Sequence, residues 1–184
     1  MVFSYLEKFY SDSEYLHKVF RQAKNEVKTE LGEQTASSHN RILYFKKFFE
    51  LLNETDICRK ALECYSMYNH TFMRSMRCYD FVYPLLNFCK KKNIKVCICT
   101  DMMCEIQIKK LMALGITDKI DYIVTSEEVG VEKPNTKMYS KVMSLVGDNN
   151  ASHYMFIGDS EEKDVIGPRS IGMNSMNVEE LLKL

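Results

Sequence analysis

Five polar residues in the second half of the chain could together bind a phosphate group and a hard divalent cation: Thr100, Asp101, Lys133, Asp159 and Asp164. The first two follow one short apolar run, and the last two follow another. A lysine neutralises phosphate oxygens, a hydroxyl donates a hydrogen bond to one of them, and carboxylates bind Mg²⁺. The residue types therefore predict a phosphate site beside a magnesium site.

Each of these residues also has an ordinary structural explanation. Thr100 could cap the next helix, Lys133-Pro134 could form a surface turn, and Gly158-Asp159-Ser160 is a common turn tripeptide. Their order along the chain, each directly after a suitable element, favours the binding site over three unrelated turns.

The elements that must position these residues alternate between helix and strand. The expected helices and strands cover residues 84–92, 95–100, 104–114, 122–125, 136–146, 154–158, 163–171 and 174–176, beginning with a helix. Unbroken apolar strands between helices indicate a parallel sheet covered on both faces. We therefore expect an α/β fold with a Rossmann-like parallel sheet core, whose chemistry gathers at the carboxyl edge of the sheet.

The first half of the chain is helical in its periodicity. An apolar stripe predicts a helix over residues 14–31 that ends at Gly32, and a second helix follows over 39–53. A third helix is expected from Thr55 or Asp56 to Tyr68, and a fourth, short one up to Tyr79. Residues 12–80 therefore form a small all-helical subdomain, and residues 81–184 form the α/β core.

Composition excludes several classes of function. Lysine plus arginine and aspartate plus glutamate number 25 each, so no global charge attracts nucleic acid. No apolar run reaches the roughly 18 residues of a membrane span. Seven cysteines without a secretory signal or a zinc-type Cys-x-x-Cys pattern indicate free thiols in a cytoplasmic protein.

Two stretches resemble the haloacid dehalogenase (HAD) superfamily of hydrolases. They are KVCICTDMMCEIQIKKLMALGITDKIDYIVTSEEVGVEKPNTKMY and YMFIGDSEEKDVIGPRSIGM, which cover most of the second half. Residues 12–80 suit the helical cap that one subgroup inserts after the first core strand. The resemblance implies a HAD-like phosphatase that uses Mg²⁺ and acts on a small phosphorylated molecule.

The resemblance assigns a role to each candidate residue. Thr100 matches the phosphate-binding hydroxyl, and Lys133 matches the lysine that orients the nucleophile and the phosphate. Asp159 matches the acidic metal ligand, and Asp164 the second acidic residue that supports the metal. Asp101 belongs to the phosphate-binding segment but stands where many members carry asparagine.

The first motif of that family, Asp-x-Asp-x-Thr, has no match in this chain. In the family the first aspartate attacks phosphorus and the second acts as acid and base. Aligned without a gap, residues 1–11 form the start of the core, Ser4 occupies the nucleophile position and Leu6 the acid/base position. Neither side chain can perform those steps, which predicts a catalytically impaired protein.

Three hypotheses for the function remain open at this stage. The first is a phosphatase-type protein, impaired by Ser4 and Leu6, that still binds a phosphorylated ligand. The second is an active Mg²⁺-dependent phosphomonoester hydrolase, whose nucleophile lies upstream of Met1 or was lost by truncation. The third is a non-catalytic interaction module that uses the helical cap.

Overall fold

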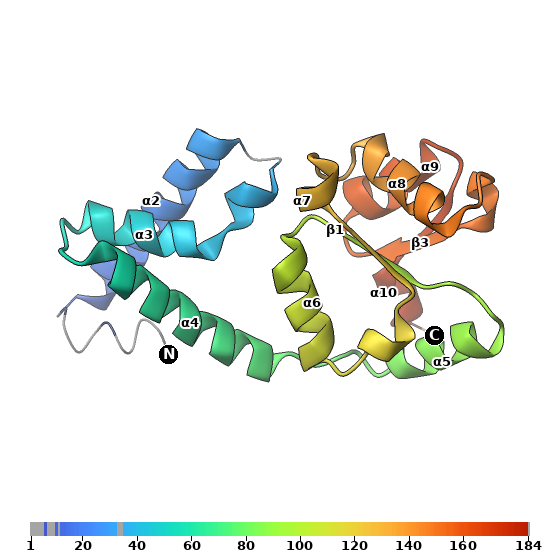
Figure 1. Cartoon of the computed structure of the whole chain (residues 1–184), viewed down its shortest axis with the longest axis horizontal. Helices are drawn as coiled ribbons and strands as arrows, with labels where there is room; N and C mark the ends of the chain where they lie inside the picture. The colour runs from blue at the N-terminus through green and yellow to red at the C-terminus, as the bar shows by residue number, and fades with distance from the viewer. Residues whose placement is uncertain (1–5, 7–9, 11, 33–34, 184) are drawn as a thin grey trace. The chain divides into compact units, whose positions relative to one another are not determined.

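The computed structural model describes residues 6, 10, 12–32 and 35–183 of the chain. The chain divides into two compact units, Met1–Met76 and Arg77–Leu184 (Figure 1). The first unit is helical, and the second alternates between helices and parallel strands. This confirms the expected α/β class with a helical subdomain.

The described residues 12–32 and 35–76 of the helical unit form three longer helices and one short 3₁₀ turn. They are α2 (Ser13–Leu31), η1 (Ala36–His39), α3 (Arg41–Leu51) and α4 (Ile57–Ser75). The Asp12 carboxylate accepts a hydrogen bond from the Tyr15 backbone N–H at 2.9 Å, which caps the start of α2. Gly32 ends the same helix with φ 80°, a backbone conformation that suits a residue without Cβ.

Aromatic side chains of α3 form the core of this unit. Phe45, Phe48 and Phe49 are almost completely buried and pack with Leu16 of α2 and Cys64 of α4. The rings of Phe48 and Phe49 meet edge to face, with centroids 5.1 Å apart. Because α3 contacts both α2 and α4, its aromatic face holds the unit together.

Two boundaries in the helical unit differ from the expectation. The helix break predicted after Tyr68 is absent, and α4 continues without interruption to Ser75. The helix expected from His39 begins instead at Arg41, where the Asn40 side chain accepts from the Ile42 N–H. The Asn40 side chain accepts a backbone N–H that has no partner within the helix, and helix α3 therefore begins directly after Asn40.

Residues 77–183, the described part of the α/β unit, contain four strands. Its elements are α5 (Val82–Lys91), β1 (Cys97–Thr100), α6 (Cys104–Ala113), η2 (Thr117–Lys119), β2 (Tyr122–Thr125), α7 (Ser126–Val129), α8 (Thr136–Val146), η3 (Ala151–His153), β3 (Met155–Gly158), η4 (Glu161–Ile166), α9 (Gly167–Arg169), β4 (Asn174–Asn177) and α10 (Val178–Leu181). The predicted ranges of β2 and α8 are confirmed residue for residue. The helix expected over 163–171 begins earlier, as a π-helical turn, η4.

The four strands form two parallel pairs. Thr100 of β1 aligns with Thr125 of β2, and Gly158 of β3 aligns with Asn177 of β4. Within the described part of the chain β1 pairs only with β2 and β3 only with β4, where one continuous sheet was expected. Each pair is joined by a helical crossover, which parallel strands require.

The β1–β2 pair is covered on both faces. Ile98 and Ile123 pack toward the core of Leu86 and Leu111, which α5 and α6 contribute. On the opposite face Cys97 and Cys99 pack against α8, and burial raises the pKa of both thiols to about 12. All seven cysteines are free thiols, as expected. No helix in the described part of the chain is long and apolar enough to cross a membrane.

Phe48→Ala should lower the free energy of unfolding by about 3–5 kcal/mol, because the removed ring leaves a cavity in the core of the helical unit. Urea unfolding followed by circular dichroism measures this loss. The control is Leu62→Ala on α4, where the side chain is 53% exposed, and this should change stability by less than about 0.5 kcal/mol. Equal losses in the two variants would contradict the assigned core.

Candidate functional site

Three of the predicted site residues come together where the strands end. Asp101 directly follows β1, Lys133 lies in the loop after α7, and Asp164 belongs to η4. The Lys133 backbone N–H donates to Asp101 Oδ1 at 2.9 Å, and Lys133 Nζ lies 2.6 Å from Asp164 Oδ1. Segments about thirty residues apart in sequence are thereby connected through one lysine.

The Lys133–Asp164 ion pair is largely removed from solvent. The side chain of Lys133 is 11% exposed and that of Asp164 is 5% exposed. Lys133 Nζ also lies 5.4 Å from the centre of the Phe156 ring, within the range of a cation–π contact. A buried charge persists only where partners compensate it, so removing either partner should be costly.

The backbone at the end of β3 lies close to the Asp164 carboxylate. Asp164 Oδ2 accepts from the Ser160 N–H at 3.1 Å, so both carboxylate oxygens have a donor. A Cβ atom at Gly158 would collide with that carboxylate. Glycine at the end of β3 therefore leaves the space in which Asp164 meets Lys133.

The Asp101 carboxylate contacts both Lys133 and Lys163. Its Oδ1 accepts from the Lys133 N–H, and its Oδ2 lies 2.9 Å from Lys163 Nζ. Lys163 Nζ also lies 3.4 Å from Glu132 Oε2. Burial lowers the pKa of Lys163, but the hydrogen bond to Asp101 and the charges of Asp101 and Glu132 raise it more, so that the pKa lies above its usual value.

Sequence reasoning missed Lys163 and Glu132. Both lie next to a predicted site residue in the sequence, Lys163 before Asp164 and Glu132 before Lys133. The side chain of Glu132 is only 1% exposed, and an acidic residue directly after the uncharged stretch 129–131 could have indicated a buried ionic partner.

Two further predicted residues, Thr100 and Asp159, are available to a ligand. Thr100 is half-buried at the end of β1, and Asp159 is exposed after β3. Neither side chain makes a hydrogen bond or ion pair with any other described residue. A hydroxyl and a carboxylate at strand ends can each serve an incoming ligand.

The carboxylates fit a magnesium ion only in part. No group of three or more potential metal ligands occurs among the described residues. Both oxygens of Asp164 already accept hydrogen bonds, which leaves Asp159 as the predicted ligand with an uncommitted carboxylate. Mg²⁺ commonly keeps several waters and takes one or two carboxylates plus phosphate oxygens, so such a site needs its ligand for completion.

The two residues aligned with the missing first motif are placed differently. Ser4 lies outside the described residues. Leu6 lies in a helical turn, 3% exposed, and packs in the core of the helical unit with Leu16 and Phe45. The sequence alignment expected Leu6 at the start of the α/β core, and the structure instead groups it with the helices, because its apolar side chain is buried among theirs.

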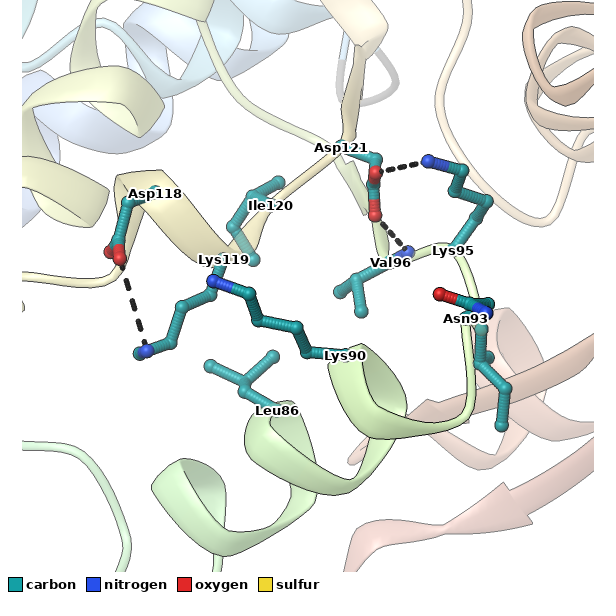
Figure 2. Close-up of a pocket in the computed structure, with 10 residues that line it drawn as sticks. Leu86, Lys90, Asn93, Lys95, Val96, Asp118, Lys119, Ile120 and Asp121 are labelled. Carbon is teal, nitrogen blue, oxygen red and sulfur yellow. Dashed lines mark hydrogen bonds and ion pairs between the residues drawn. The ribbon is translucent and has the colours of Figure 1, made fainter.

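A cavity of about 440 Å³ lies at the other end of the strands (Figure 2). Figure 2 shows Asp121, just before β2, accepting from Lys95 Nζ and from the Val96 N–H, just before β1. Thr100 ends β1 at the opposite, carboxyl edge. The cavity is therefore separate from the polar cluster described above.

Comparison with known proteins identifies similar sequences. The sequence model described as haloacid dehalogenase-like hydrolase matches residues 7–178. A ribulose-1,5-bisphosphate 5-phosphatase of Halopiger xanaduensis is 31% identical over 90% of this chain and 68% of its own length. A glyceraldehyde 3-phosphate phosphatase of Methanopyrus kandleri is 30% identical over 60% of this chain, but the match spans only 47% of that relative.

Solved structures share the fold at low sequence identity. The magnesium-bound HAD-hydrolase YfnB of Bacillus subtilis superposes with a TM-score of 0.64 at 18% identity, covering 95% of this chain and 78% of that chain. A 2-haloacid dehalogenase of Pseudomonas syringae gives a TM-score of 0.70 at 15% identity, covering 86% and 66%.

Lys133→Met should lower the free energy of unfolding by about 3–5 kcal/mol, because it leaves the Asp164 carboxylate buried without its charged partner. The matched control is Lys109→Met, which breaks the exposed pair of Lys109 and Glu105 and should cost less than about 1 kcal/mol. Urea unfolding measures both. A loss at Lys133 as small as that at Lys109 would refute the buried pair.

Proposed function

This chain belongs to the haloacid dehalogenase-like hydrolase family, and on that premise we propose that it binds a small phosphorylated molecule at the ends of β1 and β3. The observation that carries the proposal is the position of Lys133. The Lys133 backbone N–H donates to Asp101, and the Lys133 ammonium group contacts Asp164. The Thr100 hydroxyl, at the end of the same strand that precedes Asp101, remains available.

In this proposal each residue has a defined role toward phosphate. The Thr100 hydroxyl donates a hydrogen bond to one phosphate oxygen, and Lys133 neutralises negative charge on the group. Asp101 acts through Lys133, because both of its carboxylate oxygens are already engaged. Donors fixed before the ligand arrives lose little entropy on binding, which favours an anion over water.

We propose Mg²⁺ as the cation that accompanies the phosphate. Asp159 would contribute its exposed carboxylate, with Asp164 behind it as the second acidic group. When bound, the ion would neutralise phosphate charge and polarise the phosphorus–oxygen bonds. The magnesium bound to YfnB supports this choice of cation for a shared fold.

The names of the relatives support a small phosphorylated molecule as the substrate class that we propose. Two of them are named for the hydrolysis of ribulose-1,5-bisphosphate and glyceraldehyde 3-phosphate, both small phosphorylated sugars. We extend that class, and neither individual substrate, to this chain. The helical unit would act as the cap that selects among such ligands.

We further propose that hydrolysis by this chain is impaired. The sequence contains no Asp-x-Asp, which in the family supplies both the nucleophile and the acid/base, and Leu6, which aligns with the second of these positions, lies in the core of the helical unit. Loss of a group that acts as acid and base removes about 10²–10⁴ in rate. The alternative is an active hydrolase, which the similarity to named phosphatases favours.

Thr100→Val should weaken the binding of inorganic phosphate about tenfold or more, because a hydrogen bond to a charged group contributes about 1.5–3 kcal/mol. Isothermal titration with phosphate and Mg²⁺ measures the affinity. Thr117→Val, at the exposed start of η2, is the matched control and should bind as the unsubstituted chain does. Equal affinity in the two variants would remove Thr100 from the site.

Hydrolysis needs a separate assay. With p-nitrophenyl phosphate and Mg²⁺ the unsubstituted chain should release no nitrophenol above background. Turnover that disappears in Asp159→Ala would contradict the impairment and favour the active hydrolase, while leaving the phosphate site intact.

A further inference from the structure

We propose that Lys163 is a positioning residue for phosphate binding, whose ammonium group offsets Asp101 and Glu132 so that Thr100 and Lys133 can receive an anion. This inference rests on the phosphate site proposed above and extends it to a residue to which no role has been given.

Lys163 connects two segments that are distant in sequence. Its Nζ lies 2.9 Å from Asp101 Oδ2, across 62 residues, and 3.4 Å from Glu132 Oε2, across 31 residues. The two carboxylates are 13% and 1% exposed, whereas the Lys163 side chain is 35% exposed. Solvent therefore screens the acidic groups poorly, and their effect on a nearby ligand would be strong.

Within the cluster of lysines and carboxylates, Lys163 is the cation that lies against the Asp101 side chain. Asp101, Glu132 and Asp164 supply three carboxylates, and Lys133 and Lys163 supply two ammonium groups. Lys133 already lies against Asp164 at 2.6 Å. Without Lys163, the Asp101 carboxylate would lose the ammonium group that lies 2.9 Å from its Oδ2, and a negative charge in a poorly screened site repels an anion.

The backbone fixes the direction of the Lys163 side chain. The Lys163 N–H donates to Ser160 Oγ at 3.3 Å, and its carbonyl oxygen accepts from the Tyr139 hydroxyl at 2.6 Å. Both contacts hold the middle of η4, a π-helical turn, and such turns are frequent at functional sites. Because both its N–H and its carbonyl oxygen are hydrogen-bonded, the Lys163 backbone has a defined position from which the side chain reaches Asp101.

Asp101 explains why this chain requires an additional cation. An asparagine at position 101 could still accept the Lys133 N–H through its amide oxygen, without the negative charge. Aspartate keeps the hydrogen bond but adds a carboxylate beside the phosphate position. Lys163 and Asp101 should therefore act as a pair, and removing both should leave the net charge of the site unchanged.

The test uses four variants of the full chain and inorganic phosphate: Lys163→Met, Lys163→Arg, Asp101→Asn and the double variant Asp101→Asn/Lys163→Met. Lys163→Met should weaken phosphate binding about tenfold or more, which corresponds to about 1.4 kcal/mol. Lys163→Arg keeps the charge and should bind normally. The double variant should recover to within about threefold of the unsubstituted chain, because the charge balance is restored.

Lys109→Met serves as the control for a changed net charge and should leave phosphate affinity unaltered, since Lys109 is an exposed residue of α6. Asp101→Asn alone should bind phosphate at least as tightly as the unsubstituted chain. This single variant tests the inference even if Lys163→Met does not fold.

The outcomes separate the inference from the function on which it rests. Normal phosphate binding by Lys163→Met overturns the inference alone. A double variant that binds phosphate no more tightly than Lys163→Met would show that Lys163 has only a structural role, and so would weaker phosphate binding by Asp101→Asn. Either result also overturns the inference. An unsubstituted chain that binds no phosphate overturns the proposed function and the inference together.

Discussion

The buried ion pair between Lys133 and Asp164 is the interaction on which the polar cluster depends. Two charges almost removed from solvent are tolerated only with close partners and full hydrogen bonding. The Ser160 N–H and the Lys133 ammonium serve the two oxygens of Asp164, and Asp101 holds the Lys133 backbone. Because these groups come from three separate segments of the chain, satisfying one pair fixes the relative positions of the ends of β1 and β3.

The sequence predicted correctly those elements whose ends are marked by capping residues or by glycine. Helix α8 matches its expectation because Asn135 caps its start and Gly147, with φ 79°, ends it. Strand β2 matches because its apolar run is short and ends in a capping box, with Thr125 bonded to Glu128. The residues of the cluster were predictable for a similar reason, since each directly follows such an element.

Features set by contacts across the chain could not be predicted. The sequence around Tyr68 allows a helix to stop or continue, and the contact of its ring with Phe45 of α3, with centroids 6.4 Å apart, favours continuation in α4. Lys163 looks like any exposed helical lysine until Asp101, 62 residues away, is placed beside it. Leu6 has an apolar side chain that suits a strand and a helical core equally, and only packing decides between them.

The thiols of Cys97 and Cys99 give β1 a property unrelated to phosphate. Burial raises the pKa of both thiols to about 12, so few are ionised at neutral pH, and both pack against α8. Because both thiols are only partly exposed and few are ionised, alkylation of either residue should be slow in the folded unit. The rate of alkylation of either thiol, compared with that of the exposed Cys58, then measures how well β1 is protected within the α/β unit.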